Sequence, residues 1–192
     1  MSRLLYSATM SLDGFIAGPD GDMSWLGEIM ASGEAEAPGA DTQDGDAPDT
    51  DVEDLMAGIG ALLIGRRTFD GDDPNAGTEA EGAFGGQWQG PSVVLTHAPP
   101  PVAPPRTTFA TDLVTAVEEA KAAAEGRYVN VLGADVARQC LEAGLLDEVL
   151  VFVAPVLLGD GTRLFQHDGG TRIPLTPMPG RSVHGLWFTV ER

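Results

Sequence analysis

The sequence predicts an α/β domain whose central sheet is mixed, mostly parallel and flanked by helices. Short apolar runs of strand length recur between turn-forming residues along the chain. Residues 128–153 read as strand, glycine turn, helix and strand, which together make a βαβ unit. Two β-rich runs at 171–177 and 182–190 predict an antiparallel hairpin that extends the parallel strands.

The composition favours one cytoplasmic domain covering residues 1–192. The chain has 43% apolar residues, enough to fill a core, and its net charge of −18 would repel nucleic acid and anionic membranes, so neither is expected as a partner. Its one cysteine, Cys140, lies on an apolar helix face, which indicates a core residue in a reducing compartment. Neither a membrane-spanning run nor a signal-peptide pattern is visible.

Residues 3–10 predict the first strand, because apolar and small side chains suit a buried position. Residues 11–22 contain several turn formers, so a long loop is expected there. A long loop directly after a central strand is a common place for an active-site lid. An ordinary surface loop fits the same residues equally well.

Residues 31–50 carry much negative charge and little to bury, which predicts a poorly ordered acidic insertion. The aspartates in and just after it loosely resemble a calcium loop, but the Gly and Glu that an EF-hand requires are not at the right offsets. These residues are Asp41, Asp44, Asp46, Asp49 and Asp51. No metal site is therefore expected, and residues 51–57 predict a short helix with acids in its first turn.

A second strand at 60–64 runs into Gly65-Arg66-Arg67-Thr68. Glycine allows close backbone approach, and Thr68 with the following turn can present N–H groups to an anion. Two adjacent arginines are rare in so acidic a chain, and arginine suits forked hydrogen bonding to phosphate. The alternative is a pair of surface arginines that neutralise nearby acids.

A third strand at 92–96 ends at His97, before a run of prolines. If the sheet is parallel, Thr96 and His97 lie at the same edge as Gly65 and Gly133, although a lone exposed histidine is usually unremarkable. A short strand at 107–110 and a helix at 113–124, opened by Asp112, return the chain to the strand at 128–132.

Gly133 ends that strand, and Asp135 can cap a helix whose apolar residues, Val136 and Cys140 among them, recur at helical spacing until Gly144. Open α/β sheets bind ligands at the carboxyl ends of their strands, and a helix N-terminus there attracts phosphate. The turn is therefore a candidate phosphate site. A plain βαβ unit without a ligand is the alternative.

The chain ends with a strand at 149–153, a Gly-Asp-Gly turn at 159–161 and the terminal hairpin. The nearness of that turn to a site does not follow from spacing. In the hairpin, Trp187 and Val183 would share one face of the sheet, and Phe188 and Leu186 the other.

Four segments together carry a family resemblance. They are SLDGFIAG at 11–18, ALLIGRRTF at 61–69, VVLTHAPPP at 93–101 and VLGADVARQCLEAGLLDEVLVFVAPVLLGDGTRLF at 131–165. The chain resembles the dihydrofolate reductase-like superfamily, and most closely the RibD C-terminal domain family, the reductase domain of bacterial riboflavin biosynthesis proteins. The resemblance implies a three-layer α/β/α fold with the C-terminal hairpin, and a homodimeric reductase that uses NADPH and acts on a small molecule.

The resemblance also implies roles for residues. Gly65, Arg66, Arg67 and Thr68 would meet the adenosine and pyrophosphate phosphates; Leu95, Thr96 and His97 would lie near the adenine and 2′-phosphate; Gly133, Ala134, Asp135 and Val136 would bind the pyrophosphate. Ala8, Asp13, Gly14, Leu158 and Gly159 would line the nicotinamide and substrate pocket. Asp13 is the catalytic candidate, for orienting substrate or relaying a proton, although it can equally cap an Asp-Gly turn.

Departures from the family pattern qualify these implications. Ala134 stands where the family often has a second glycine, and Asp135 puts a negative charge beside the expected pyrophosphate unless it points away as a helix cap. Dihydrofolate reductases carry a carboxylate beyond the first-loop tryptophan, but counting on from Trp25 reaches Met30 and then the insertion, so folate reduction is not expected. A phosphorylated riboflavin-pathway substrate would need basic residues, for which Arg163 and Arg181 are the spare candidates.

The sequence therefore predicts a reductase that transfers hydride from NADPH to a small heterocyclic or carbonyl compound. Its mechanism would be mostly positional, holding C4 of the nicotinamide against an electrophilic carbon. A non-catalytic nucleotide-binding or sensor protein on the same fold is the alternative, motivated by Ala134, Asp135 and the missing acid.

Overall fold

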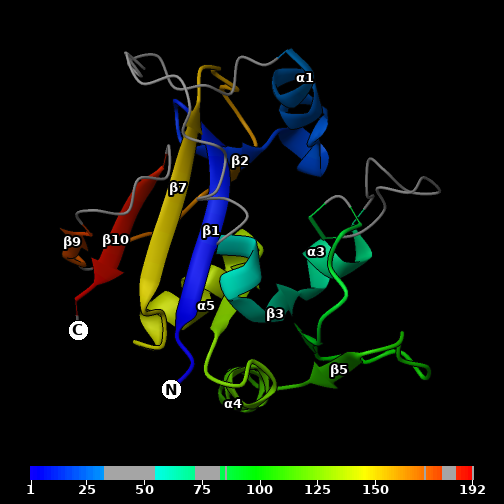
Figure 1. The fold of residues 1–192 in the computed structure, drawn as a ribbon. Helices are drawn as coiled ribbons and strands as arrows, with labels where there is room; N and C mark the ends of the chain where they lie inside the picture. The colour runs from blue at the N-terminus through cyan, green and yellow to red at the C-terminus, as the bar shows by residue number, and fades with distance from the viewer. Residues whose placement is uncertain (33–54, 72–82, 85, 171, 179–184, 192) are drawn as a thin grey trace.

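The computed structural model describes residues 1–32, 55–71, 83–84, 86–170, 172–178 and 185–191, and within them one eight-stranded sheet has the order β5-β4-β3-β6-β1-β7-β10-β9 (Figure 1). The strands are β1 (Leu4–Ser11), β3 (Ile59–Gly65), β4 (Ser92–Leu95), β5 (Thr107–Ala110), β6 (Tyr128–Leu132), β7 (Glu148–Ala154), β9 (Leu175–Pro177) and β10 (Leu186–Val190). The first six strands in this order, from β5 through β4, β3, β6 and β1 to β7, are parallel to one another. Strand β10 pairs antiparallel with β7 and β9. The predicted mixed sheet and terminal hairpin are confirmed.

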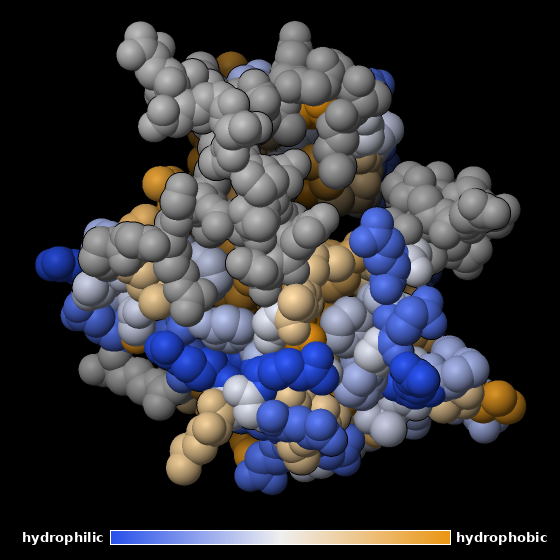
Figure 2. Space-filling view, in the orientation of Figure 1, coloured by the Kyte–Doolittle hydropathy of each residue, from blue (hydrophilic) through white to orange (hydrophobic). Residues whose placement is uncertain are grey.

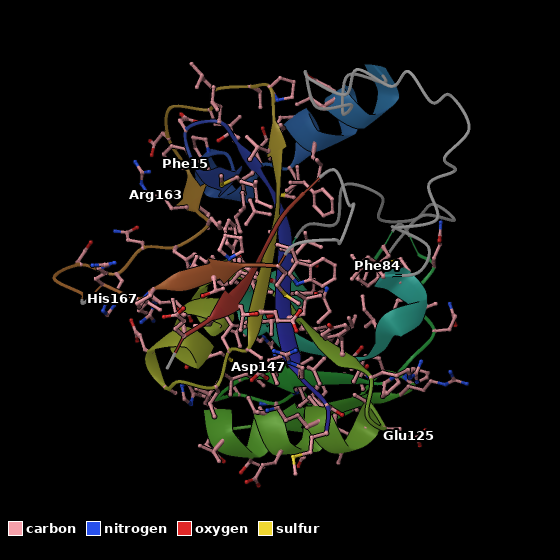
Figure 3. The ribbon with its side chains drawn as sticks, turned by 60° about the vertical axis from the view of Figure 1, so that its left-hand side comes forward. Phe15, Phe84, Glu125, Asp147, Arg163 and His167 are labelled. Atoms are coloured by element: carbon pink, nitrogen blue, oxygen red, sulfur yellow. The ribbon has the colours of Figure 1, made fainter. Side chains whose placement is uncertain are left out.

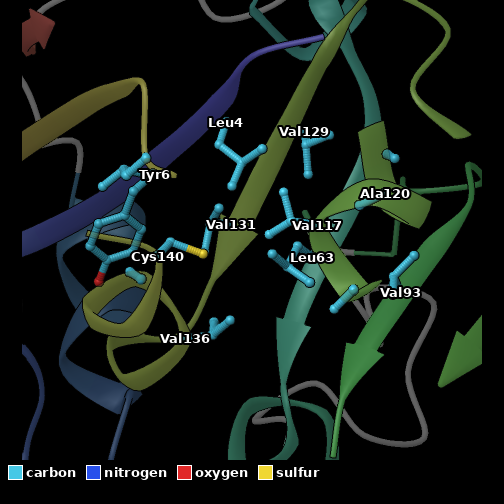
Figure 4. Close-up of a cluster of buried hydrophobic side chains, with 14 of the residues drawn as sticks. Leu4, Tyr6, Leu63, Val93, Val117, Ala120, Val129, Val131, Val136 and Cys140 are labelled. Atoms are coloured by element: carbon cyan, nitrogen blue, oxygen red, sulfur yellow. The ribbon is translucent and has the colours of Figure 1, made fainter. Parts of the chain in front are cut away.

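Two helices, α4 (Leu113–Ala123) and α5 (Ala134–Glu142), pack on one face of the sheet. Asp112 caps α4 as expected, its carboxylate accepting a hydrogen bond of 2.9 Å from the Thr115 N–H. The helices bury their apolar faces against alternate residues of β1, β3 and β6 (Figure 4). The residues labelled there are Leu4, Tyr6, Leu63, Val93, Val117, Ala120, Val129, Val131, Val136 and Cys140. Each large side chain so buried contributes about 1.5–3 kcal/mol to folding.

Cys140 is a core residue, as predicted. It is fully buried within this cluster, and burial raises the pKa of its thiol to about 12. The thiolate form is therefore scarce at neutral pH, and the side chain acts as a small apolar group.

The opposite face of the sheet carries two separate apolar clusters. One surrounds Leu62, Ile64 and Val94 and includes Phe69 from α3 (Arg66–Asp70). The other surrounds Leu5, Leu150 and Trp187 and includes Leu55 and Met178. Tyr128 packs against both clusters. Tyr128 of β6 therefore connects the two clusters at the amino end of the sheet.

The segment predicted to be a long loop, 11–22, contains regular structure. Strand β2 (Phe15–Ala17) pairs antiparallel with β8 (Thr162–Arg163), and a 3-10 helix, η1 (Pro19–Gly21), follows. The expectation of one long loop was wrong at 15–17 and 19–21, and the strand was missed because it is only three residues long and its partner lies far away in the sequence. The chain then enters helix α1 (Ser24–Ser32).

The acidic segment predicted at 31–50 falls mostly outside the described residues. Ala31 and Ser32 end α1, and residues 33–54 are not described, including the aspartates with the loose calcium-loop spacing. Of the helix expected at 51–57, the described part is helical from 55 to 58.

A buried acid joins the amino ends of the central strands. The Glu148 carboxylate is fully buried and lies 2.7 Å from Nη1 of Arg3. It also accepts hydrogen bonds from Nε1 of Trp187 at 2.7 Å and from the hydroxyl of Tyr128 at 3.2 Å. The neighbouring Asp147 carboxylate accepts a 2.8 Å hydrogen bond from the Leu4 N–H. Four strands therefore meet at these two acids.

The surface near this amino edge is mainly hydrophilic. Figure 2 shows polar and charged side chains across the lower half of the view, where the N-terminus and α4 lie in Figure 1. Among the described residues, no helix has the length and apolar character needed to cross a membrane.

Replacing Arg3 with methionine should lower the free energy of unfolding by about 1.5–3 kcal/mol, because the buried Glu148 carboxylate would lose a charged hydrogen-bond donor. Urea denaturation at pH 7 measures the loss. The control is Arg138→Met, which removes an arginine paired with exposed acids and should cost under about 1 kcal/mol. Equal losses for the two variants would contradict the role assigned to Glu148.

Candidate functional site

The carboxyl half of β1 is partly exposed although the strand is central in the sheet. Leu4, Leu5 and Tyr6 are buried, but every residue from Ser7 to Met10 is partly exposed. The last residues of β3, β4 and β6 are partly exposed as well. Because open α/β sheets bind ligands at the carboxyl ends of parallel strands, this edge is the candidate site.

Asp13 ties the turn after β1 to the segment after β7. Its Oδ1 accepts hydrogen bonds from Oγ of Ser11 at 2.6 Å and from the Leu158 N–H at 3.1 Å, and its Oδ2 accepts from the Gly159 N–H at 2.7 Å. These bonds, that from Ser11 above all, lower the pKa of Asp13 to about 2. The predicted pocket residues Asp13, Leu158 and Gly159 therefore form one bonded group, in which the carboxylate is ionised at neutral pH.

Ser11 is a site residue that the sequence reasoning missed. It is fully buried, and its hydroxyl both donates to Asp13 and accepts a 3.0 Å hydrogen bond from the Phe15 N–H. The spacing Ser-x-Asp-Gly could have revealed this residue, because a serine hydroxyl can donate a hydrogen bond to a carboxylate two residues later in a turn.

Arg163 lies beside this group, although the sequence offered it only as a spare cation. Its guanidinium carbon is 4.4 Å from the centre of the Phe15 ring, and its Nη1 donates to the Asp13 carbonyl at 3.5 Å (Figure 3). The pairing of β2 with β8 brings these residues together. Arg181, the other spare cation, lies outside the described residues.

A second group forms where β3 and β6 end. A side chain at Gly133 would collide with Oγ1 of Thr68, and the backbone at Gly133 has a φ of +107° that other residues rarely adopt. A Cβ at Gly65 would lie 3.5 Å from Cγ1 of Val136. Four of the predicted cofactor-binding residues thus pack together, at the start of α5.

Asp135 does not cap α5, contrary to the expectation. Gly133 is the N-cap, and Asp135 lies inside the first turn. Its carboxylate accepts hydrogen bonds from Nη2 of Arg138 at 2.8 Å and from Nε2 of Gln139 at 2.9 Å, because residues three and four positions apart are neighbours on a helix. The hydrogen bond from Arg138 is the main cause that lowers the pKa of Asp135.

The third predicted segment, Leu95-Thr96-His97, lies on the other side of β3. Thr96 is buried, and its Oγ1 accepts a 3.1 Å hydrogen bond from the Ala98 N–H, while His97 is exposed. Arg66 donates from Nη1 to the Ala98 carbonyl at 3.1 Å and pairs through Nε with Asp70. Arg66 therefore connects the ends of β3 and β4.

The predicted site residues thus lie in two parts of one edge. Strand β3 ends between β4 and β6, so Gly65 is flanked by Thr96 and Gly133. Strand β1, with Ala8 in its exposed half, lies between β6 and β7, next to the group around Asp13. Across the described residues, no group of three or more His, Cys, Asp or Glu side chains is placed to hold a metal ion.

Sequence comparison assigns the family. The family model of the RibD C-terminal domain matches residues 3–178. The chain belongs to the RibD C-terminal domain family. A search of curated proteins by sequence finds no match.

Solved structures show the same fold at low identity. A putative riboflavin biosynthesis protein from Shewanella sp. PV-4 is 20% identical, with a TM-score of 0.68 and 99% of both chains covered. A Thermotoga maritima diaminohydroxyphosphoribosylaminopyrimidine deaminase/5-amino-6-(5-phosphoribosylamino)uracil reductase is 17% identical, with a TM-score of 0.58; the match covers 98% of this chain and 56% of that one. The Saccharomyces cerevisiae riboflavin biosynthesis reductase Rib7 is 16% identical, with a TM-score of 0.51 and coverage of 98% and 89%. These likenesses confirm the predicted dihydrofolate reductase-like fold.

Gly133→Ala should destabilise the protein more than Gly126→Ala. Both glycines have positive φ, which costs other residues about 1–2 kcal/mol, but a side chain at Gly126 meets open space. The backbone at Gly133, with φ +107° and ψ +133°, lies outside the left-handed helical region, and an added Cβ would also force the exposed Thr68 hydroxyl to rotate, so the extra cost at Gly133 should be about 1–3 kcal/mol. Urea denaturation compares the two variants, and similar losses would contradict the strained conformation assigned to Gly133.

Asp13→Asn should destabilise the protein at neutral pH, because an amide nitrogen cannot accept the hydrogen bond from Gly159. Folding lowers the pKa of Asp13 from 3.8 to about 2, so the carboxylate stabilises the fold above about pH 4 and this contribution is lost as the pH falls toward 2. The difference between the urea midpoints of the wild type and the variant should therefore narrow between pH 7 and pH 3. Asp20→Asn, at an exposed position on η1, is the control, and a difference that does not shrink in acid would contradict the assignment.

Proposed function

We propose that this chain is an NADPH-dependent reductase that transfers hydride to a small heterocyclic or carbonyl compound. The observation that carries the proposal is the contact between Thr68 and the Gly133 turn at the start of α5. At this contact the hydroxyl of Thr68, the N-terminus of α5 and the adjacent Arg66 and Arg67 lie at the carboxyl edge of a parallel sheet. Membership of a family whose solved relatives include reductases supports the same reading.

The residues of this edge fit a pyrophosphate. The first N–H groups of a helix have no acceptor within the helix, so those of Ala134, Asp135 and Val136 are available to an anion. The Asp135 carboxylate is turned along α5 to Arg138, which offsets its charge. The side chain of Arg67 is exposed, forms no hydrogen bond with another described residue and acts on Asp135 electrostatically. Arg138 is shared with Glu142, so the positive groups that a phosphate near Gly133 would meet are Arg67 and the N-terminus of α5.

Arg66 and the end of β4 are the proposed determinants of cofactor choice. The guanidinium of Arg66 lies against the carbonyl of Ala98, next to Thr96 and His97. An arginine held there is placed to bind the 2′-phosphate that distinguishes NADPH from NADH. NADPH, when bound, supplies the hydride.

The substrate side works by positioning. The group around Asp13 fixes the turn that borders the exposed half of β1, with Ala8 on one side and Gly159 on the other. With three hydrogen bonds and a low pKa, the Asp13 carboxylate suits an anchoring role better than proton relay. The chain's own contribution is to hold the two reactants in register and to exclude water. The cytoplasmic location and the homodimer expected from the sequence stay predictions.

Titration with NADPH and with NADH, followed by the fluorescence of Trp25, Trp88 and Trp187, tests the proposal. Saturable binding of NADPH is expected, and Arg66→Ala should weaken NADPH by roughly 10- to 100-fold while changing NADH much less, since a hydrogen bond to a charged group is worth about 1.5–3 kcal/mol. Arg127→Ala is the matched control, because it removes an arginine from the opposite edge, where Arg127 bonds to Ile59.

Absence of any saturable change up to millimolar NADPH, in folded protein, would overturn the reductase proposal. Equal losses for NADPH and NADH in Arg66→Ala would instead show that the assignment of the 2′-phosphate to Arg66 is wrong.

A further inference from the structure

Arg163 is an exposed cation at the border of the candidate site that pairs with no acid of the described chain. Its guanidinium carbon lies 4.4 Å from the centre of the buried Phe15 ring. Its Nη1 is 3.5 Å from the Asp13 carbonyl oxygen, which is long for a hydrogen bond. Among the described residues, no carboxylate forms an ion pair with it.

The contact with Phe15 leaves the hydrogen-bonding edge of this guanidinium open. A guanidinium that stacks on an aromatic ring uses one face, whereas its N–H groups point outward in its own plane. Those of Nε and Nη2 donate to no other described residue. Because the ring already holds the guanidinium, a ligand would lose little affinity to the ordering of the arginine. Arg163 is thus preorganised for a planar anion.

The position of this arginine is fixed beside the turn that follows β1. The pairing of β2 with β8 brings Arg163 next to Phe15, as Figure 3 shows, and a Cβ at Gly14 would lie 4.0 Å from Nη1. The Asp13 carboxylate of the same turn already accepts three hydrogen bonds from other residues. A group bound by Arg163 would therefore lie at the border of the exposed half of β1.

The charges nearby favour a ligand with one negative charge. Segments 11–22 and 156–165 meet at this turn, and Arg163 is their only basic residue. Hydrogen bonds lower the pKa of Asp13 and of Asp22, so both are ionised at neutral pH. A phosphate ester carries about two negative charges at pH 7 and would be repelled more strongly than a carboxylate, which matches one guanidinium with two parallel hydrogen bonds. The aspartates of the two segments are Asp13, Asp20, Asp22 and Asp160.

We infer that Arg163 binds a carboxylate of the substrate, so that the site selects carboxylate-bearing compounds over their neutral and phosphorylated analogues. The inference rests on the proposed function for the reaction itself, whereas binding at Arg163 is measurable without cofactor. It narrows the substrate class from heterocyclic or carbonyl compounds to those that carry a carboxylate. Arg163 is then a specificity-determining residue, and the ring that is reduced lies along β1.

Benzoate, benzamide and phenyl phosphate are matched probes, because they share one aromatic ring and carry one, no and about two negative charges at pH 7. Titration of isotope-labelled protein at constant ionic strength measures the three affinities by NMR, from the Nε–H resonance of Arg163 and the backbone N–H resonances of Gly14 and Phe15. Benzoate should bind at least fivefold more tightly than benzamide, as expected for one charge-assisted interaction at an exposed arginine. It should also bind more tightly than phenyl phosphate.

Three variants assign the preference to the guanidinium. Arg163→Gln should bring the affinities for benzoate and benzamide within twofold of each other, whereas Arg163→Lys, which keeps the charge, should retain a weakened preference. Arg106→Gln is the matched control, since it removes another exposed arginine, before the edge strand β5 on the far side of the sheet. It should leave the preference unchanged.

Four outcomes would overturn the inference. They are an Arg163 resonance that does not move with benzoate at tens of millimolar, equal binding of benzoate and benzamide, tighter binding of phenyl phosphate than of benzoate, and an Arg163→Gln variant that keeps the preference. The wild-type titration decides the question by itself if Arg163→Gln fails to fold.

The result is separable from that of the reductase proposal. A preference for benzoate that depends on Arg163, in a protein that does not bind NADPH, would uphold this inference and overturn the proposed reaction. Binding of NADPH without that preference would do the reverse.

Discussion

The buried carboxylate of Glu148 fixes the alignment of the strands on which the candidate site is built. Its donors come from Arg3 before β1, from Tyr128 in β6 and from Trp187 in β10. This acid of β7 thus joins the two adjacent strands, β1 and β10, and also β6 on the far side of β1. A slip of β7 by one residue would move this carboxylate to the face covered by α5, away from all three donors. The cost of a buried, unpaired charge therefore specifies the register of the central strands.

That register determines which residues meet at the opposite edge. With β1 aligned against β6 and β7, Ser7 reaches Asn130 and the turn after β1 reaches the segment after β7. At that edge a second carboxylate, that of Asp13, accepts hydrogen bonds from the backbone N–H groups of Leu158 and Gly159. These bonds hold the turn after β1 against the segment after β7. The two acids act differently: Glu148 is buried and joins side chains, whereas Asp13 is partly exposed and joins loops.

The sequence predicted the parts of the fold that local patterns specify. Apolar runs bounded by Gly and Pro marked the parallel strands, and the strand at 128–132 and the cap at Asp112 were placed correctly. The pairing of β2 with β8 was missed because it joins two very short strands that are distant in the chain. Asp135 was misplaced because local propensity makes it a good cap, whereas Arg138, one helical turn later, provides a stronger partner. The hydrogen bond between Ser7 and Asn130 could not be predicted because it depends on the register of β1 against β6, which no local pattern contains.

The placement of Asp135 bears on the choice between an enzyme and a non-catalytic protein of the same fold. Three features motivated the second: the charge of Asp135, the alanine at 134 and the acid missing after Trp25. The first is offset by Arg138 and by the nearby Arg67. The second loses force because Gly133, not the residue after it, has the positive φ that the turn requires, while Ala134 begins an ordinary helix. The third concerns the folate pterin alone, so it bears on the identity of the substrate. The three features that favoured a non-catalytic protein therefore bear more on which substrate is bound than on whether a substrate is reduced.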